Sequence, residues 1–164
     1  MNSILPADIL ALARRVVEDN AKLGRKIATA ESCTGGLVAA ALTEIPGSSA
    51  VLDRGFVTYS NQSKQQMLGV AEDIIESLGA VSVATAWAMA QGAIKHSLAD
   101  VAVAISGVAG PDGGTAQKPV GTVVFAKAER GKAEINAEEM RLEGEGRGEI
   151  RYRAVLVALE LLLP

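Results

Sequence analysis

Residues 100–106, Asp-Val-Ala-Val-Ala-Ile-Ser, are the segment that most restricts the fold. The run is apolar at consecutive positions, which predicts a short strand that is buried on both of its faces. A sheet that contains such a strand must be covered by helices on both sides. A glycine-rich loop, residues 107–114, follows directly after this strand.

The remaining patterns predict helices that alternate with strands early in the chain and paired strands late in it. Helices are expected at 8–22, 36–44, 71–78, 82–98 and 148–163, with a further helix that starts near Asn61 as its N-cap and carries Lys64; strands are expected at 26–30, 51–59, 121–127 and 133–142. This order favours an α/β fold, a three-layer α/β/α sandwich with a mixed, mostly parallel sheet. The 164 residues fit one domain, 1–164.

Composition restricts the core and the partners. Apolar residues make up 49% of the chain but aromatic residues only 3%, so the core must consist of Ala, Val, Leu and Ile. The net charge is −3, and the basic residues at 14–15 and 147–153 are interspersed with Glu, which is typical of solvated helix faces. We therefore expect no nucleic-acid partner.

The few potential metal ligands lie apart in the sequence. Cys33 is the single cysteine, and Glu31, Asp53 and Asp112 do not form a spaced ligand set. We expect no metal and no cofactor. Neither a signal peptide nor an apolar run of about 20 residues is found, which favours a cytoplasmic protein without membrane contact.

Ser32 is the first candidate for chemistry. It follows a predicted strand and precedes Gly35-Gly36, so its hydroxyl is expected at the carboxyl edge of the sheet, where α/β proteins bind ligands. The N–H groups of residues 33–36 (Cys33, Thr34, Gly35 and Gly36) would point the same way and could hold an oxyanion. Two alternatives remain open: Ser32 or Thr34 caps the following helix, or the helix start binds a phosphate.

A serine nucleophile needs a base. His96 is the only histidine and lies at the end of a helix that faces the surface there, which disfavours a Ser-His-Asp arrangement. Lys64 could serve if burial lowered its pKa from about 10.4 by about three units, and Tyr59 could relay the proton. The alternatives are that Lys64 is a solvated charge and that Tyr59 is a core residue with an exposed tip.

Cys33 is intrinsically more nucleophilic than its neighbour Ser32. Successive residues of an extended segment point to opposite faces, so we expect only one of the two to reach a cleft. Because Cys33 has no histidine partner, we expect it to be a small buried residue and favour the serine.

The loop of residues 106–114 offers a second glycine-rich segment. Its composition suits the close approach of backbone to a ligand and an anion-binding nest of N–H groups. It matches neither the dinucleotide fingerprint nor the P-loop, because no Gly-Lys-Ser/Thr follows.

Five blocks in this order resemble the CinA C-terminal family over essentially the whole chain. They are Ala-Glu-Ser-Cys-Thr-Gly-Gly (30–36), Gly-Phe-Val-Thr-Tyr-Ser-Asn (55–61), Gly-Ala-Val-Ser (79–82), Ser-Gly-Val-Ala-Gly-Pro-Asp-Gly-Gly (106–114) and Lys-Pro-Val-Gly-Thr-Val (118–123). The resemblance implies hydrolysis of nicotinamide mononucleotide to nicotinate mononucleotide and ammonia. In longer relatives a domain that resembles molybdopterin-binding proteins precedes this one.

The family's serine–lysine dyad and assisting tyrosine fall on Ser32, Lys64 and Tyr59. The resemblance thus implies that Ser32 attacks the carboxamide and that N–H groups around Cys33 hold the oxyanion. The loop that includes Ser106, Gly107 and Gly110 is the candidate for holding the nucleotide. The alternative is a non-catalytic nucleotide- or protein-binding module, and a homo-oligomer is compatible with either.

Overall fold

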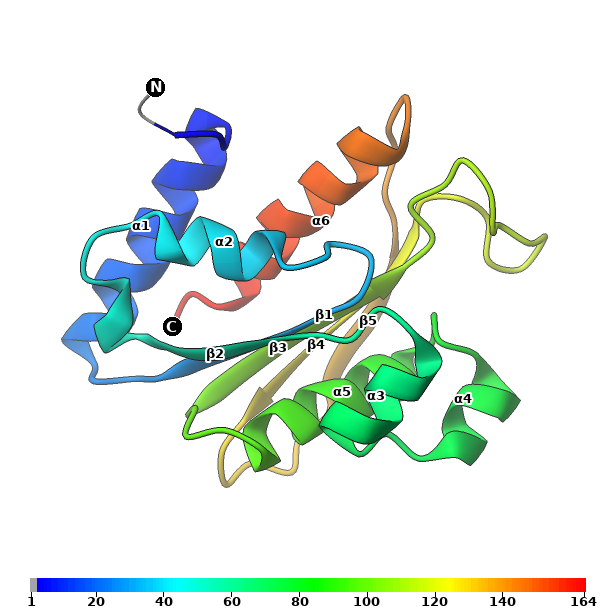
Figure 1. The fold of residues 1–164 in the computed structure, drawn as a ribbon, viewed down its shortest axis with the longest axis horizontal. Helices are drawn as coiled ribbons and strands as arrows, with labels where there is room; N and C mark the ends of the chain where they lie inside the picture. The colour runs from blue at the N-terminus through cyan, green and yellow to red at the C-terminus, as the bar shows by residue number, and fades with distance from the viewer. Residues whose placement is uncertain (1–2) are drawn as a thin grey trace.

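The computed structural model describes residues 3–164 as a five-stranded sheet between two layers of helices (Figure 1). Helices α1, α2 and α6 cover one face, and α3, α4 and α5 cover the other. This arrangement confirms the three-layer α/β/α prediction. The elements are α1 (Ala7–Lys22), β1 (Ile27–Glu31), α2 (Leu37–Thr43), the 3-10 helix η1 (Ser48–Ala50), β2 (Leu52–Val57), α3 (Asn61–Leu68), α4 (Glu72–Leu78), α5 (Val83–Lys95), β3 (Val101–Gly107), β4 (Thr122–Glu129), β5 (Asn136–Arg141) and α6 (Arg147–Leu161).

The sheet has the strand order β2-β1-β3-β4-β5. Strand β1 pairs in parallel with β2 and with β3, so that Ala30 lies opposite both Phe56 and Ala104. The pairs β3/β4 and β4/β5 are antiparallel, so β4 alone runs against the other strands. Consequently β1, β2 and β3 all end at the same edge of the sheet.

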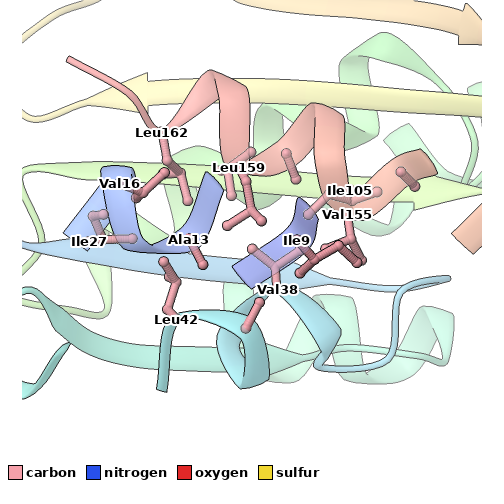
Figure 2. Close-up of a cluster of buried hydrophobic side chains, with 14 of the residues drawn as sticks. Ile9, Ala13, Val16, Ile27, Val38, Leu42, Ile105, Val155, Leu159 and Leu162 are labelled. Atoms are coloured by element: carbon pink, nitrogen blue, oxygen red, sulfur yellow. The ribbon is translucent and has the colours of Figure 1, made fainter. Parts of the chain in front are cut away.

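Strand β3 shows why the sheet carries two different cores. Its larger side chains, Val101, Val103 and Ile105, belong to the cluster beneath α1, α2 and α6, whereas Ala102 and Ala104 face α5. The two-residue period of a strand separates the two sets. Figure 2 shows the first cluster, in which α1, α2 and α6 contribute Ile9, Ala13, Val16, Val38, Leu42, Val155 and Leu159, and in which Leu162 directly follows α6.

The second core consists largely of alanine, as the shortage of aromatic residues predicted. Small side chains on both surfaces let α5 pack closely against β3 and β4. The same closeness extends to α3, because a Cβ atom at Gly92 of α5 would overlap with the carbonyl group of Leu68. The position of α3 is therefore fixed by a backbone contact.

Most predicted boundaries agree with the structure to within a few residues, with one revised cap. Ser60, not Asn61, is the N-cap of α3, since its Oγ accepts a hydrogen bond from the Ser63 N–H at 3.0 Å. Asn61 is the first residue of the helix instead. Within residues 3–164, no helix is both long and apolar enough to span a bilayer.

Candidate active site

A cavity of about 200 Å³ lies at the edge of the sheet where the parallel strands end. The turn after β1, the segment after β2, the end of β3 and the first residue of α6 all contribute to it. This is the edge at which open α/β sheets place their ligands. The lining residues are Ser32, Cys33, Tyr59, Asn61, Lys64, Ala80, Val81, Ser106, Gly107, Ala109 and Arg147.

Lys64 and Ser32 meet inside this cavity. Their Nζ and Oγ atoms are 3.0 Å apart, although 32 residues separate them in the chain. Lys64 is only 1% exposed, so the reading of this residue as a solvated charge is wrong. The first turn of α3 follows β2 directly and thereby carries the amine to the end of β1.

The surroundings of Lys64 favour an uncharged amine. Burial lowers its pKa, and among residues 3–164 no carboxylate forms a salt bridge with it. Nζ also donates hydrogen bonds to the carbonyl oxygens of Thr58 (2.9 Å) and Tyr59 (3.2 Å). With its bond to Ser32 Oγ, Nζ thus donates to three acceptors, and in the uncharged amine one of these three positions would be a lone pair.

Residue Cys33 lines the cavity beside Ser32, while its side chain belongs to the hydrophobic cluster beneath α1, α2 and α6. The strand ends at Glu31, and residues 32–36 form a turn in which side chains no longer alternate. Cys33 is 5% exposed, and burial raises the pKa of its thiol to about 11. The buried state predicted for Cys33 is confirmed, and its thiol is protonated at neutral pH.

The side chain of Tyr59 contacts Arg147 and not the Ser32–Lys64 pair. It is 63% exposed, and its hydroxyl accepts a hydrogen bond from Arg147 Nη2 at 3.0 Å. Arg147 Nη1 donates to the carbonyl of Gly110 at 2.9 Å. Tyr59 therefore touches Lys64 through its backbone carbonyl, while its ring and Arg147 form the outer rim of the cavity.

The helix α2 does not begin with a serine or threonine N-cap. Neither Ser32 nor Thr34 caps the helix: the N-cap is Gly36, which has a φ of +96° that suits glycine. Two N–H groups of the first helical turn, those of Val38 and Ala39, donate to the carboxylate of Glu31 at 3.0 and 3.1 Å. The start of α2 is thus occupied by the chain's own carboxylate and is not open to a phosphate.

The loop after β3 contributes less backbone to the cavity than its glycines suggested. The Ser106 hydroxyl donates to the Ala80 carbonyl at 2.8 Å, and a Cβ atom at Gly107 would lie 2.8 Å from Val123 Cγ2. Gly110 is outside the cavity lining and packs against Val120. Ser106 and Gly107 do line the cavity. The glycines of this segment, however, allow close packing: Gly107 lies against β4, and Gly110 lies against the loop that precedes β4.

Arg147 is the functional candidate that the sequence did not reveal. Its segment looked like a solvated helix face, because Glu145 and Glu149 flank it and Arg151 and Arg153 follow. Nothing in the local pattern shows that the first residue of α6 reaches the ends of β2 and β3. His96, by contrast, lies away from the cavity, with Nδ1 2.8 Å from the Gly92 carbonyl oxygen.

Among residues 3–164 there is no cluster of His, Cys, Asp or Glu side chains that could hold a metal ion. Fold and site together define an α/β protein with a buried serine–lysine pair where its parallel strands end. Comparison with known sequences identifies the family to which this α/β protein belongs. The sequence model of the CinA C-terminal domain matches residues 9–164, and the chain belongs to this family.

Relatives of two lengths support the assignment. "Nicotinamide-nucleotide amidohydrolase PncC" of Escherichia coli strain K12 is 47% identical over 156 residues, which cover 95% of this chain and 93% of the relative. A "CinA-like protein" of Mycolicibacterium vanbaalenii is 54% identical over 139 residues, which cover 85% of this chain and 32% of the relative. The chain spans about a third of the length of the longer relatives.

A solved structure shares the whole fold. The crystal structure of the competence/damage inducible protein CihA from Agrobacterium tumefaciens has a TM-score of 0.94 and 54% sequence identity. The match covers 98% of this chain and 96% of that one.

Proposed function

We propose that this chain hydrolyses the carboxamide of nicotinamide mononucleotide, giving nicotinate mononucleotide and ammonia. The observation that carries the proposal is the buried Lys64 amine, which lies 3.0 Å from the Ser32 hydroxyl and forms no salt bridge with a residue in the range 3–164. The relative named for this activity matches nearly the full length of both chains, which supports the choice of substrate.

Ser32 and Lys64 share the proton transfers of the reaction. Neutral Lys64 takes the Oγ proton while Oγ attacks the carboxamide carbon, and the resulting Lys64 ammonium gives that proton to the amide nitrogen, which leaves as ammonia when its bond to the carbon breaks. Water then attacks the nicotinoyl ester with Lys64 again as the base, which releases the carboxylate and restores Ser32. General-base assistance of this kind contributes about 10²–10⁴-fold.

The oxyanion of the tetrahedral intermediate would be bound by a backbone N–H group at the start of the turn formed by residues 32–36. The N–H of Ser32 donates to the Ile105 carbonyl and that of Gly35 to the Ser32 carbonyl. Among residues 3–164 no acceptor in another residue is found for the Cys33 N–H, and Cys33 lines the cavity. We assign the oxyanion to this N–H, and one such donor is worth about 10²–10³-fold in kcat.

The cavity size suggests how the nucleotide lies. Sites that enclose whole drug-sized ligands have volumes of about 300–1,000 Å³, whereas this cavity has about 200 Å³. We place the nicotinamide ring inside it and the phosphate at its rim. Arg147 is the cation at that rim, and Tyr59 holds its guanidinium in place.

The test is ammonia release from nicotinamide mononucleotide by the wild type, Ser32→Ala and Lys64→Met. We expect both variants to lose at least about 10³-fold in kcat. Lys95→Met, which alters an exposed lysine of α5, is the matched control and should retain wild-type activity. Wild-type turnover in Ser32→Ala would refute the mechanism.

The competing function is a non-catalytic nucleotide- or protein-binding module. It predicts tight binding of nicotinamide mononucleotide by the wild type without release of ammonia. Calorimetric titration alongside the ammonia assay separates the two functions.

A further inference from the structure

Two charged side chains outside the cavity hold the turn that carries Ser32. Glu31 precedes the turn at the end of β1, and Arg151 reaches it from α6. Neither lines the cavity, yet both bond to the main chain or side chains of residues 32–39. Glu31 only accepts hydrogen bonds and Arg151 only donates them.

The side chain of Glu31 is fully buried, and both of its carboxylate oxygens accept hydrogen bonds. Its two oxygens accept hydrogen bonds from four donors: the hydroxyls of Thr34 (2.7 Å) and Thr29 (3.4 Å) and the N–H groups of Val38 (3.0 Å) and Ala39 (3.1 Å). The negative charge also complements the positive end of the α2 dipole. Because Glu31 directly precedes Ser32, these bonds set the direction in which the chain leaves β1.

Arg151 acts on the opposite side of the turn. Its Nε donates to the carbonyl of Cys33 at 3.0 Å, and Nη2 donates to that of Thr34 at 3.4 Å. A trans peptide is planar, with its carbonyl and N–H groups on opposite sides. Fixing these two carbonyls therefore fixes the rotation of the peptide planes between residues 33 and 34 and between residues 34 and 35, which are the second and third planes after Ser32.

We propose that Glu31 and Arg151 are positioning residues that hold Ser32 in line with Lys64 and with the oxyanion donor. This proposal rests on the proposed function. With either residue removed, the turn gains freedom and Oγ shifts relative to Nζ. A misplacement of about 1 Å in a reacting group costs about 10²-fold in rate, while the groups that bind the substrate stay in place.

The first test uses three variants of α6 and measures kcat and KM separately. Arg151→Met removes both donors, and we expect kcat to fall about 10–100-fold while KM stays within about twofold. Arg151→Lys restores one donor and should recover part of the lost kcat. The control, Arg153→Met, alters an exposed arginine that bonds only to Glu149, and should leave both constants unchanged.

The second variant, Glu31→Gln, keeps the shape of the side chain but turns one acceptor into a donor that faces other donors. We expect the same fall in kcat at constant KM. A raised KM with unchanged kcat, or a lower melting temperature with unchanged kcat, would overturn the proposal for that residue. If Glu31→Gln fails to fold, the kinetic constants of the Arg151 variants still test whether the turn is held by these side chains.

A third readout is independent of the proposed substrate: the rate at which a fluorophosphonate labels Ser32, with Ser32→Ala as the blank. Slower labelling of Arg151→Met and Glu31→Gln than of the wild type supports positioning, and equal rates overturn it. A wild type that is labelled but releases no ammonia would contradict the substrate alone. A wild type that is not labelled at Ser32 would overturn the positioning role.

Discussion

At the scale of single residues, the most consequential feature is the burial of Lys64. A lysine is normally protonated at neutral pH, and burial without a carboxylate partner lowers the pKa of its amine. The two carbonyls of Thr58 and Tyr59 fix the position of Nζ beside the Ser32 hydroxyl. In the proposed reaction, Lys64 would take the role of the histidine base in a Ser-His-Asp triad.

This arrangement predicts the pH dependence of the reaction. Protonated Lys64 cannot accept the Ser32 proton, so kcat/KM should fall about tenfold per pH unit below the Lys64 pKa. Since that pKa is lowered, the fall should begin at lower pH than the ordinary lysine value of 10.5 allows. The measurement is kcat/KM from pH 5 to pH 10.

Lys64→Arg provides the control for that profile, because a guanidinium stays charged throughout the range. It should be inactive at every pH. An active Lys64→Arg variant, or a wild-type kcat/KM that already falls about tenfold per pH unit from pH 10 downward, would contradict the assignment of Lys64 as a base with a lowered pKa.

Cys33 gives a second prediction at this scale. With a pKa of about 11, on the order of one thiol in three thousand is ionised at pH 7.5. Iodoacetamide should therefore modify the folded protein far more slowly than the urea-unfolded chain, as mass spectrometry can follow. Rapid alkylation of the folded protein would show that the thiol is activated.

The sequence showed the residue types of the site but not all of their positions. Ser32 could be placed because a strand followed by Gly35-Gly36 defines a sheet edge. For Lys64 the sequence could not distinguish a buried base from a solvated charge, since the burial of a side chain depends on contacts with residues far along the chain. Arg147 was missed for the same reason: its partners, Tyr59 and Gly110, are 88 and 37 residues away.

At the scale of elements, the contact between α3 and α5 sets the position of the base. Gly92→Ala would push a Cβ atom against the Leu68 carbonyl group. Overpacking of this kind costs about 1–3 kcal/mol, and moving α3 should also lower kcat by displacing Lys64. Urea unfolding and the ammonia assay measure the two effects.

Gly148→Ala is the matched substitution in α6, where an added Cβ meets no atom within 4 Å. Alanine is favoured over glycine inside a helix by about 0.5–1 kcal/mol, so this variant should be more stable than the wild type. Equal stability of the two variants would show that the α3–α5 contact is not tight.

Element types were predictable because their patterns are local. The run of consecutive apolar residues in β3 and the apolar stripe of α1 each need only a few neighbours to be recognised. The end of β1 was harder, since Glu31 looks like a loop residue until its four donors are seen. Its carboxylate can lie inside the protein only because α2 starts directly beside it.

At the scale of the whole molecule, the site draws on both ends of the chain. Ser32 comes from the turn after β1 and Arg147 from α6, and α1 packs against α6 on the same face of the sheet. No part of the chain can therefore form the site alone. We expect activity and structure to be lost in one transition.

Urea titration tests this expectation with two probes. Fluorescence of Trp87 on α5 reports the face opposite α1 and α6, and ammonia release reports the site. The two midpoints should coincide. Loss of activity at clearly lower urea would show that the site opens before the domain unfolds.

The edge position of β2 has a thermal consequence for the proposed reaction. Ser32 follows an inner strand with neighbours on both sides, whereas Lys64 follows a border strand that is tied on one side only. As temperature rises, border strands are expected to breathe first, and the amine would drift from its hydroxyl while that hydroxyl stays still. Below the unfolding transition such openings would be brief and would close again, so the pairing between these two strands would set how much the distance between Lys64 Nζ and Ser32 Oγ fluctuates.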